Sequence, residues 1–193
     1  AVGLYPLMYV FASSPISIIE GKGTLGAHPL WLTAFYLHII LGGVALLVGW
    51  PQFFPKWRNR HLPLHRKLGK VYIGSILLVS GPTSFFLAFF AFGGIGTKMG
   101  FGLLAIFWFT STLLAFLAVR RKQISSHKEW MIRSYALSLA AVSLRIYMPI
   151  MQAGFRWDFE YSYSWVAWIC WIPNILVAEW IIFRQRTNFT LTS

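Results

Sequence analysis

Hydrophobic residues are collected along this chain into five long, nearly uninterrupted runs, separated by short polar or basic stretches. Each run holds roughly 18 to 22 residues, which at 1.5 Å per residue is enough for a helix to cross a hydrocarbon core about 30 Å thick. The pattern therefore predicts five transmembrane helices, over residues 31–50, 71–92, 101–119, 130–150 and 165–183.

Prolines interrupt this pattern in two ways. Backbone groups inside a bilayer cannot bond to water, so each run is expected to be helical, with Pro82 and Pro173 as kinks rather than breaks. Residues 1–19 are also apolar, but Pro6 and Pro15 interrupt them and no initiating Met is present. This stretch is expected to be part of a sixth, truncated helix or the end of a chain shortened by processing.

The composition agrees with a membrane protein. Of the 193 residues 57% are apolar and 11% charged, whereas a soluble domain is about 45 to 50% apolar and about 25% charged. We therefore expect an all-α fold, an integral membrane helical bundle that forms one domain over 1–193.

The formal charge of +12 raises the question of nucleic acid, and the positions of the basic residues answer it. No soluble basic and aromatic module is present, so nucleic acid is not an expected partner, whereas membrane lipids are. Alternate connections carry thirteen of the 17 Lys and Arg, which predicts that these connections and the C-terminus face the cytoplasm. The thirteen are Lys56, Arg58, Arg60, Arg66, Lys67, Lys70, Arg120, Arg121, Lys122, Lys128, Arg133, Arg184 and Arg186.

Four stretches carry a family resemblance. They are HKEWMIRSYALSLAAVSLRIYMP at 127–149, WICWIPNILVAEW at 168–180, LHIILGGVALLVGWPQF at 37–53 and HRKLGKVY at 65–72. Together they resemble a bacterial family of predicted multi-pass membrane proteins known only as a domain of unknown function. The resemblance covers about residues 31–180. It implies a helical bundle in the bacterial inner membrane and implies no activity.

An outer site is predicted from ionisable residues inside the helices, because such residues are costly in lipid and usually functional. His38 and Arg145 are expected at similar depth toward the non-cytoplasmic side. His38 shares a helix face with Gly42, Ala45 and Gly49, which a flat ligand or another helix could approach. Close packing of small residues is the alternative. The small residues follow His38 by four, seven and eleven positions. The same spacing on the fourth helix aligns a small and polar stripe that is predicted to face the bundle interior: Ser134, Ser138, Ala141 and Arg145.

An inner site is predicted from His65 and His127, which begin two helices at comparable depth. Two neutral imidazoles on neighbouring helices are what a six-coordinate b-type haem requires. His61 offers a third nitrogen for a metal ion, although Pro63 separates it from His65. The alternative is that these histidines contact lipid headgroups or cap helices.

Glu179 is the one carboxylate within the last run, and Arg133 is its nearest expected counter-charge. A structural ion pair is predicted, with a proton relay or quinone contact as the alternative.

Two functional hypotheses stay open. Cys170 stands alone, and no catalytic nucleophile and base, phosphate-binding loop or carboxylate dyad is visible. The first hypothesis is a non-catalytic membrane subunit or accessory protein that associates with other membrane protein subunits. The second is a b-type haem or quinone-binding electron carrier that uses the histidines named above.

Overall fold

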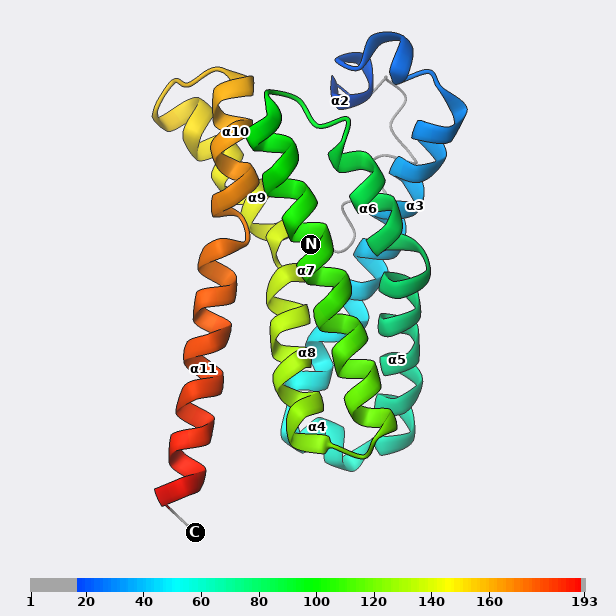
Figure 1. Ribbon diagram of the computed structural model, residues 1–193, viewed down its shortest axis with the longest axis vertical. Helices are drawn as coiled ribbons and strands as arrows, with labels where there is room; N and C mark the ends of the chain where they lie inside the picture. Colours follow the sequence, from blue (N-terminus) through cyan, green and yellow to red (C-terminus); the bar gives the residue numbers. More distant parts are fainter. Residues whose placement is uncertain (1–16, 192–193) are drawn as a thin grey trace. The chain divides into compact units, whose positions relative to one another are not determined.

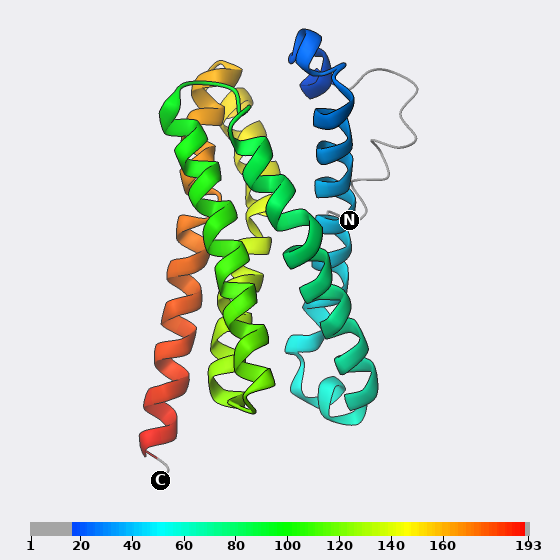
Figure 2. The ribbon, with the colours of Figure 1, turned by 45° about the vertical axis from the view of Figure 1, so that its right-hand side comes forward.

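A computed structural model describes residues 17–191 of the chain, and side chains within 19–187. The elements of residues 17–191 are helices joined by short turns, with no strand among them (Figures 1 and 2). The truncated helix predicted over 1–19 lies almost wholly outside the described residues.

Five helical segments in the described part of the chain are long and apolar enough to cross a membrane, which confirms the predicted all-α bundle with five spans. All but one of the predicted runs fall inside these segments. The exception is the run 71–92, because its helix begins earlier and ends at Ala88. The segments are Pro29–Phe53, Leu62–Ala88, Ile95–Arg120, Ile124–Gly154 and Phe159–Thr187.

The chain divides into two compact units, Ala1–Phe90 and Ala91–Ser193. That they fold as the one domain predicted over 1–193 stays a prediction.

In the first unit, helix α3 packs against the segment formed by α5, η4 and α6 (Figure 2). Ala45 of α3, Tyr72 of α5 and Ile76 of η4 are fully buried. The elements of the first unit are α2 (Ser17–Glu20), η2 (Gly23–Leu25), α3 (Pro29–Gly49), η3 (Trp50–Phe53), α4 (Pro55–Arg60), α5 (Leu62–Gly74), the π-helix η4 (Ser75–Ser80) and α6 (Gly81–Ala88).

In the second unit, α7 and α8 form an antiparallel hairpin that is the largest helix contact, α10 packs on α7 and α9, and α11 packs mainly on α8 (Figure 1). Gly100 lets α7 and α10 approach closely, since a Cβ there would lie 2.9 Å from the Ala167 carbonyl oxygen. The elements are α7 (Ile95–Arg120), α8 (Ile124–Ser138), α9 (Ala140–Pro149), the π-helix η5 (Ile150–Gly154), α10 (Phe159–Ile169) and α11 (Ile172–Leu191).

The spanning segments contain irregularities at and away from proline. Pro82 stands in the first turn of α6, directly after the π-helix, where the hydroxyl of Thr83 donates to the Val79 carbonyl at 2.8 Å. Pro173 is the second residue of α11, which follows a turn at Cys170 and Trp171. The fourth segment is interrupted at Leu139, between α8 and α9, without any proline. Side chains beside these points donate to backbone carbonyls, at Val79, Ala136 and Cys170.

Candidate functional sites in the two helical units

His38 joins α3 to the π-helix of the first unit. Its Nδ1 lies 3.2 Å from the Ser80 carbonyl oxygen, and the Ser80 hydroxyl lies 3.4 Å from the His38 carbonyl oxygen. A carbonyl oxygen only accepts, so Nδ1 donates and the ring orientation is defined. Ser80 is fully buried and also accepts from the Thr83 hydroxyl at 3.3 Å. π-helical turns are frequent at functional sites, and here one turn carries the partner of the intramembrane histidine.

The small face of α3 lies in the same contact. Ala45 is fully buried and Gly49 is also buried, while a Cβ on Gly42 would lie 4.0 Å from the Ser80 hydroxyl. Within the first unit, these small residues let α3 approach the segment that carries Ser80.

His127 joins the first turns of α8 to the end of α7 in the second unit. Its Nδ1 lies 2.9 Å from the Ala115 carbonyl oxygen, and the ring is half-buried. Because the carbonyl must accept, the neutral ring carries its hydrogen on Nδ1 and its lone pair on Nε2. This is the tautomer of a histidine that binds iron or another metal through Nε2.

The contact that holds His127 continues along both helices. Thr112 of α7 and Ser134 of α8 share a hydrogen bond of 2.7 Å between their hydroxyls, buried between the helices. One turn further, the Trp108 indole donates to the Ser138 hydroxyl at 2.8 Å. Hydroxyl and indole groups that bond across helices are satisfied without water, so a polar seam links α7 and α8.

The predicted stripe on the fourth span is most deeply buried in its first part. Ser134 and Ser138 are buried in the seam. Arg145 instead directs Nη1 to the carbonyl of Ala141 on its own helix, at 2.7 Å, and its side chain is half-buried. Such a bond to the preceding turn satisfies one guanidinium donor inside the segment.

Two ion pairs link α8 to α11. Arg133 donates from Nε and Nη2 to the two carboxylate oxygens of Glu179, at 2.6 and 2.9 Å. These are the two residues that the sequence predicts to pair. Arg186 binds Glu129 in the same two-pronged manner, at 2.7 and 2.5 Å. Glu129 also lies 4.0 Å from Arg133, and the Arg133 guanidinium lies 4.5 Å from the Trp130 ring centre. The four charges therefore form one alternating network.

The remaining predicted histidines lie at the start of α5. The His65 amide donates to the His61 carbonyl at 2.9 Å, and the His61 ring lies 5.8 Å from the ring of Trp57. The described residues contain no group of three or more His, Cys, Asp or Glu side chains that could hold a metal ion. His65 and His38 belong to the first unit, whereas His127 and Arg145 belong to the second. The pairing of His65 with His127 and that of His38 with Arg145 therefore stay predictions.

Asn174, which was not among the predicted site residues, lies at the centre of a polar junction. Its amide nitrogen donates to the carbonyls of Ala136 and Cys170, at 3.3 and 3.0 Å, and lies 3.1 Å from the Ser143 hydroxyl. The junction joins α11 to both helices of the fourth span, beside its interruption. The sequence signal was an amide next to Pro173 in an otherwise apolar run.

The chain was compared with known protein families, curated proteins and solved structures. A family model described as a predicted membrane protein (DUF2306) matches residues 35–182, which include His38, His65, His127, Arg145 and both members of the Arg133–Glu179 pair. No curated protein and no solved structure matches the chain.

Proposed function

This chain belongs to the DUF2306 family of predicted membrane proteins, and from the geometry of its histidines we propose that it binds a b-type haem in the membrane and carries electrons. The observation that carries the proposal is the 2.9 Å bond between His127 Nδ1 and the Ala115 carbonyl oxygen. A bond of this kind orients the ring and makes Nε2 more basic, as in haem and metal ligands.

The donor set favours haem over a bare metal ion. A zinc site needs three or four protein ligands close together. The porphyrin of a haem fills four iron positions itself, so the protein supplies only axial ligands, and one well-oriented imidazole is one of them. His65 as the second axial ligand stays a prediction of the sequence.

The test is the visible spectrum of the purified protein after expression with a haem supply. We expect a Soret band that shifts on reduction with dithionite. Substitution His127→Ala should abolish it, while the exposed His28 in a matched His28→Ala variant should not matter. A protein without a Soret band, or a band that survives His127→Ala, overturns the proposal.

A conservative variant separates ligation from helix packing. In His127→Asn, the amide nitrogen stands close to the position of Nδ1 and can still donate to the Ala115 carbonyl, but no atom replaces Nε2. Haem ligation predicts a folded protein that has lost the Soret band. A purely structural role predicts that the wild type has no Soret band. It also predicts that His127→Asn is more stable than His127→Ala.

A non-catalytic subunit or accessory role is the second candidate, and the reciprocal bonds between His38 and Ser80 favour it. These bonds use the histidine to hold α3 against the π-helix. If this candidate is right, His38→Ala lowers the melting temperature, and on native gels of solubilised membranes the variant no longer migrates with a larger complex. A wild-type protein that already migrates alone on these gels would count against the accessory role. The predicted outer site of His38 and Arg145, for a quinone carbonyl or an anionic headgroup, stays a prediction.

A further inference from the structure

Residues 50–70 connect the two long helical segments of the first unit, and we call them the basic hairpin. They comprise η3, α4 and the first half of α5 (Figure 1). It carries six basic residues and no acidic one. All six side chains are exposed except Arg58, which is half-buried and donates to the neighbouring Asn59 at 3.4 Å. The six are Lys56, Arg58, Arg60, Arg66, Lys67 and Lys70.

Exposed aromatic residues accompany these charges. Trp50 and Phe54 are 54% and 51% exposed, and their rings meet edge to face with centres 5.3 Å apart. Trp57 follows on α4 between basic residues. Amphipathic aromatic rings prefer the level of lipid headgroups, so the hairpin has the composition of a segment at the membrane surface.

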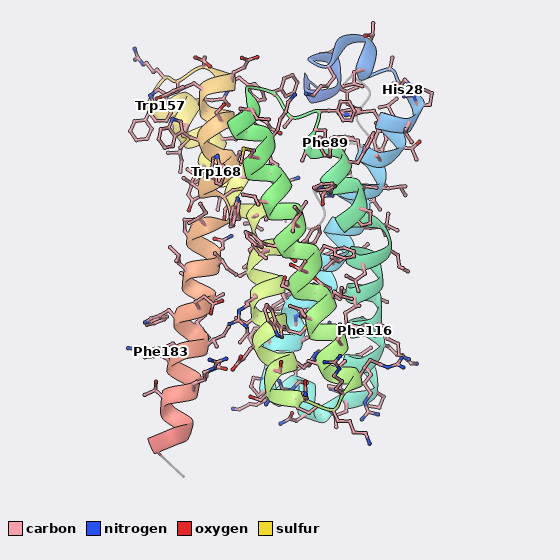
Figure 3. The ribbon with its side chains drawn as sticks, viewed as in Figure 1. His28, Phe89, Phe116, Trp157, Trp168 and Phe183 are labelled. Carbon is pink, nitrogen blue, oxygen red and sulfur yellow. The ribbon has the colours of Figure 1, made fainter. Side chains whose placement is uncertain are left out.

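The first unit contains no carboxylate that could neutralise this hairpin. Glu20 is its one acidic residue, and it precedes α3, whose 21 residues span about 30 Å. His28, the residue before α3, marks that opposite end of the helix (Figure 3). A separation of this size exceeds the Debye length of about 8 Å at physiological salt, so Glu20 cannot compensate the hairpin.

In the second unit, two basic residues have carboxylate partners. Its Arg133 and Arg186 are bound by Glu179 and Glu129, within the protein. Among the described residues, the basic side chains of the hairpin form no ion pair with a carboxylate. Their charged groups are therefore available to anions from outside the first unit.

We propose that the basic hairpin is a binding site for the phosphate headgroups of anionic phospholipids. The exposed ammonium and guanidinium groups supply charge-assisted hydrogen bonds to phosphate oxygens, and the aromatic rings set the depth at which the headgroups are met. The hairpin also contains the predicted ligands His61 and His65, but the proposed lipid contacts come from its Lys, Arg and aromatic side chains, so the inference does not require haem binding.

Native mass spectrometry of the full chain, titrated with phosphatidylglycerol or phosphatidylcholine, tests the site. We expect at least a tenfold preference for phosphatidylglycerol in the wild type. Neutralising four of the six basic residues of the hairpin should reduce the preference to about twofold, since a tenfold preference shared equally by six residues leaves about twofold for the remaining two. This variant carries Lys56→Gln, Arg60→Gln, Arg66→Gln and Lys67→Gln.

A variant of equal charge change in the second unit is the control. It should retain most of the preference, and equal losses in the two variants would overturn the proposal. The control carries Arg120→Gln, Arg121→Gln, Lys122→Gln and Lys128→Gln.

Two measurements on the unmodified protein remain informative if the hairpin variant does not fold. The preference for phosphatidylglycerol should fall steeply between about 0.05 M and about 0.5 M salt, as exposed charges are screened. Inorganic phosphate should not compete with the lipid at equal concentration. A preference that is absent or unaffected by salt, or full competition by inorganic phosphate, overturns a lipid headgroup site.

Discussion

The ion pair between Arg133 and Glu179 allows a quantitative test of how α11 is held. The pair has two hydrogen bonds, at 2.6 and 2.9 Å, and the side chains are 16% and 48% exposed. The changes are Arg133→Gln, Glu179→Gln and the two together. Each single change leaves one charge without its main partner, whereas the double change leaves two neutral amides that can bond to each other.

The exposure of the pair sets the magnitude. Exposed ion pairs contribute about 0 to 1 kcal/mol, and breaking a buried pair by removing one partner costs about 3 to 5 kcal/mol. This pair is intermediate, so we expect either single change to lower the free energy of unfolding by about 2 kcal/mol. Glu129, 4.0 Å from Arg133, partly compensates the loss of Glu179. The coupling energy should therefore be about 1 kcal/mol rather than the upper end of the known range.

The assay is reversible unfolding of the purified protein in mixed detergent micelles, followed by circular dichroism. The double variant should be more stable than the sum of the single losses predicts. Glu160, an exposed residue at the start of α10, supplies the control, because Glu160→Gln should add to Arg133→Gln without coupling. Additivity within about 0.3 kcal/mol for Arg133 and Glu179 would refute the idea that the two residues stabilise the contact of α8 with α11.

Two further predictions use matched positions. Gly100→Ala should destabilise the second unit by about 1 to 3 kcal/mol, because the new Cβ would lie 2.9 Å from a backbone oxygen. Gly102→Ala on the same helix, with no atom within 4 Å of its Cβ position, should be neutral or slightly stabilising, and equal melting temperatures would contradict the packing argument. For topology, an exposed Cys at Asn59 should resist an impermeant thiol reagent in intact cells while one at Ile95 reacts, and the reverse labelling would overturn the predicted orientation.

The number of spanning helices was predictable because it depends on length and hydrophobicity alone. A bilayer requires an apolar run of a certain length and an internally bonded backbone, and both are visible in the residues. The helix bounds were less predictable. The second span begins at Leu62 rather than Val71, because basic residues on α5 continue the helix beyond the apolar run.

The local irregularities were predictable from prolines only in part. Beside the π-helix before Gly81 and the interruption at Leu139, side chains from other helices bond to backbone carbonyls. In the first unit that donor is His38, from another helix. Such a pairing is a property of tertiary structure, so no local pattern announces it.

The candidate ligands were predictable as residue types but not as geometry. A histidine at a basic helix end is visible in the sequence, whereas its acceptor is a backbone carbonyl, which every residue possesses. That His127 would bond to Ala115 therefore depended on the alignment of α7 with α8. The contact of Arg133 with Glu179 could be predicted from the sequence, because the chain contains few carboxylates with which Arg133 could pair.

The orientation of His127 should depend on the polar seam between α7 and α8, and one substitution tests this dependence. Thr112 bonds to Ser134 at 2.7 Å on the same side of α7 as the Ala115 carbonyl. Thr112→Val removes that bond with little change of volume, so it should lower stability by about 1 kcal/mol and weaken haem retention. Thr110→Val is the control, because Thr110 is exposed and bonds only to its own helix. If both variants retain haem equally, the histidine is positioned by its own turn, and the seam serves stability alone.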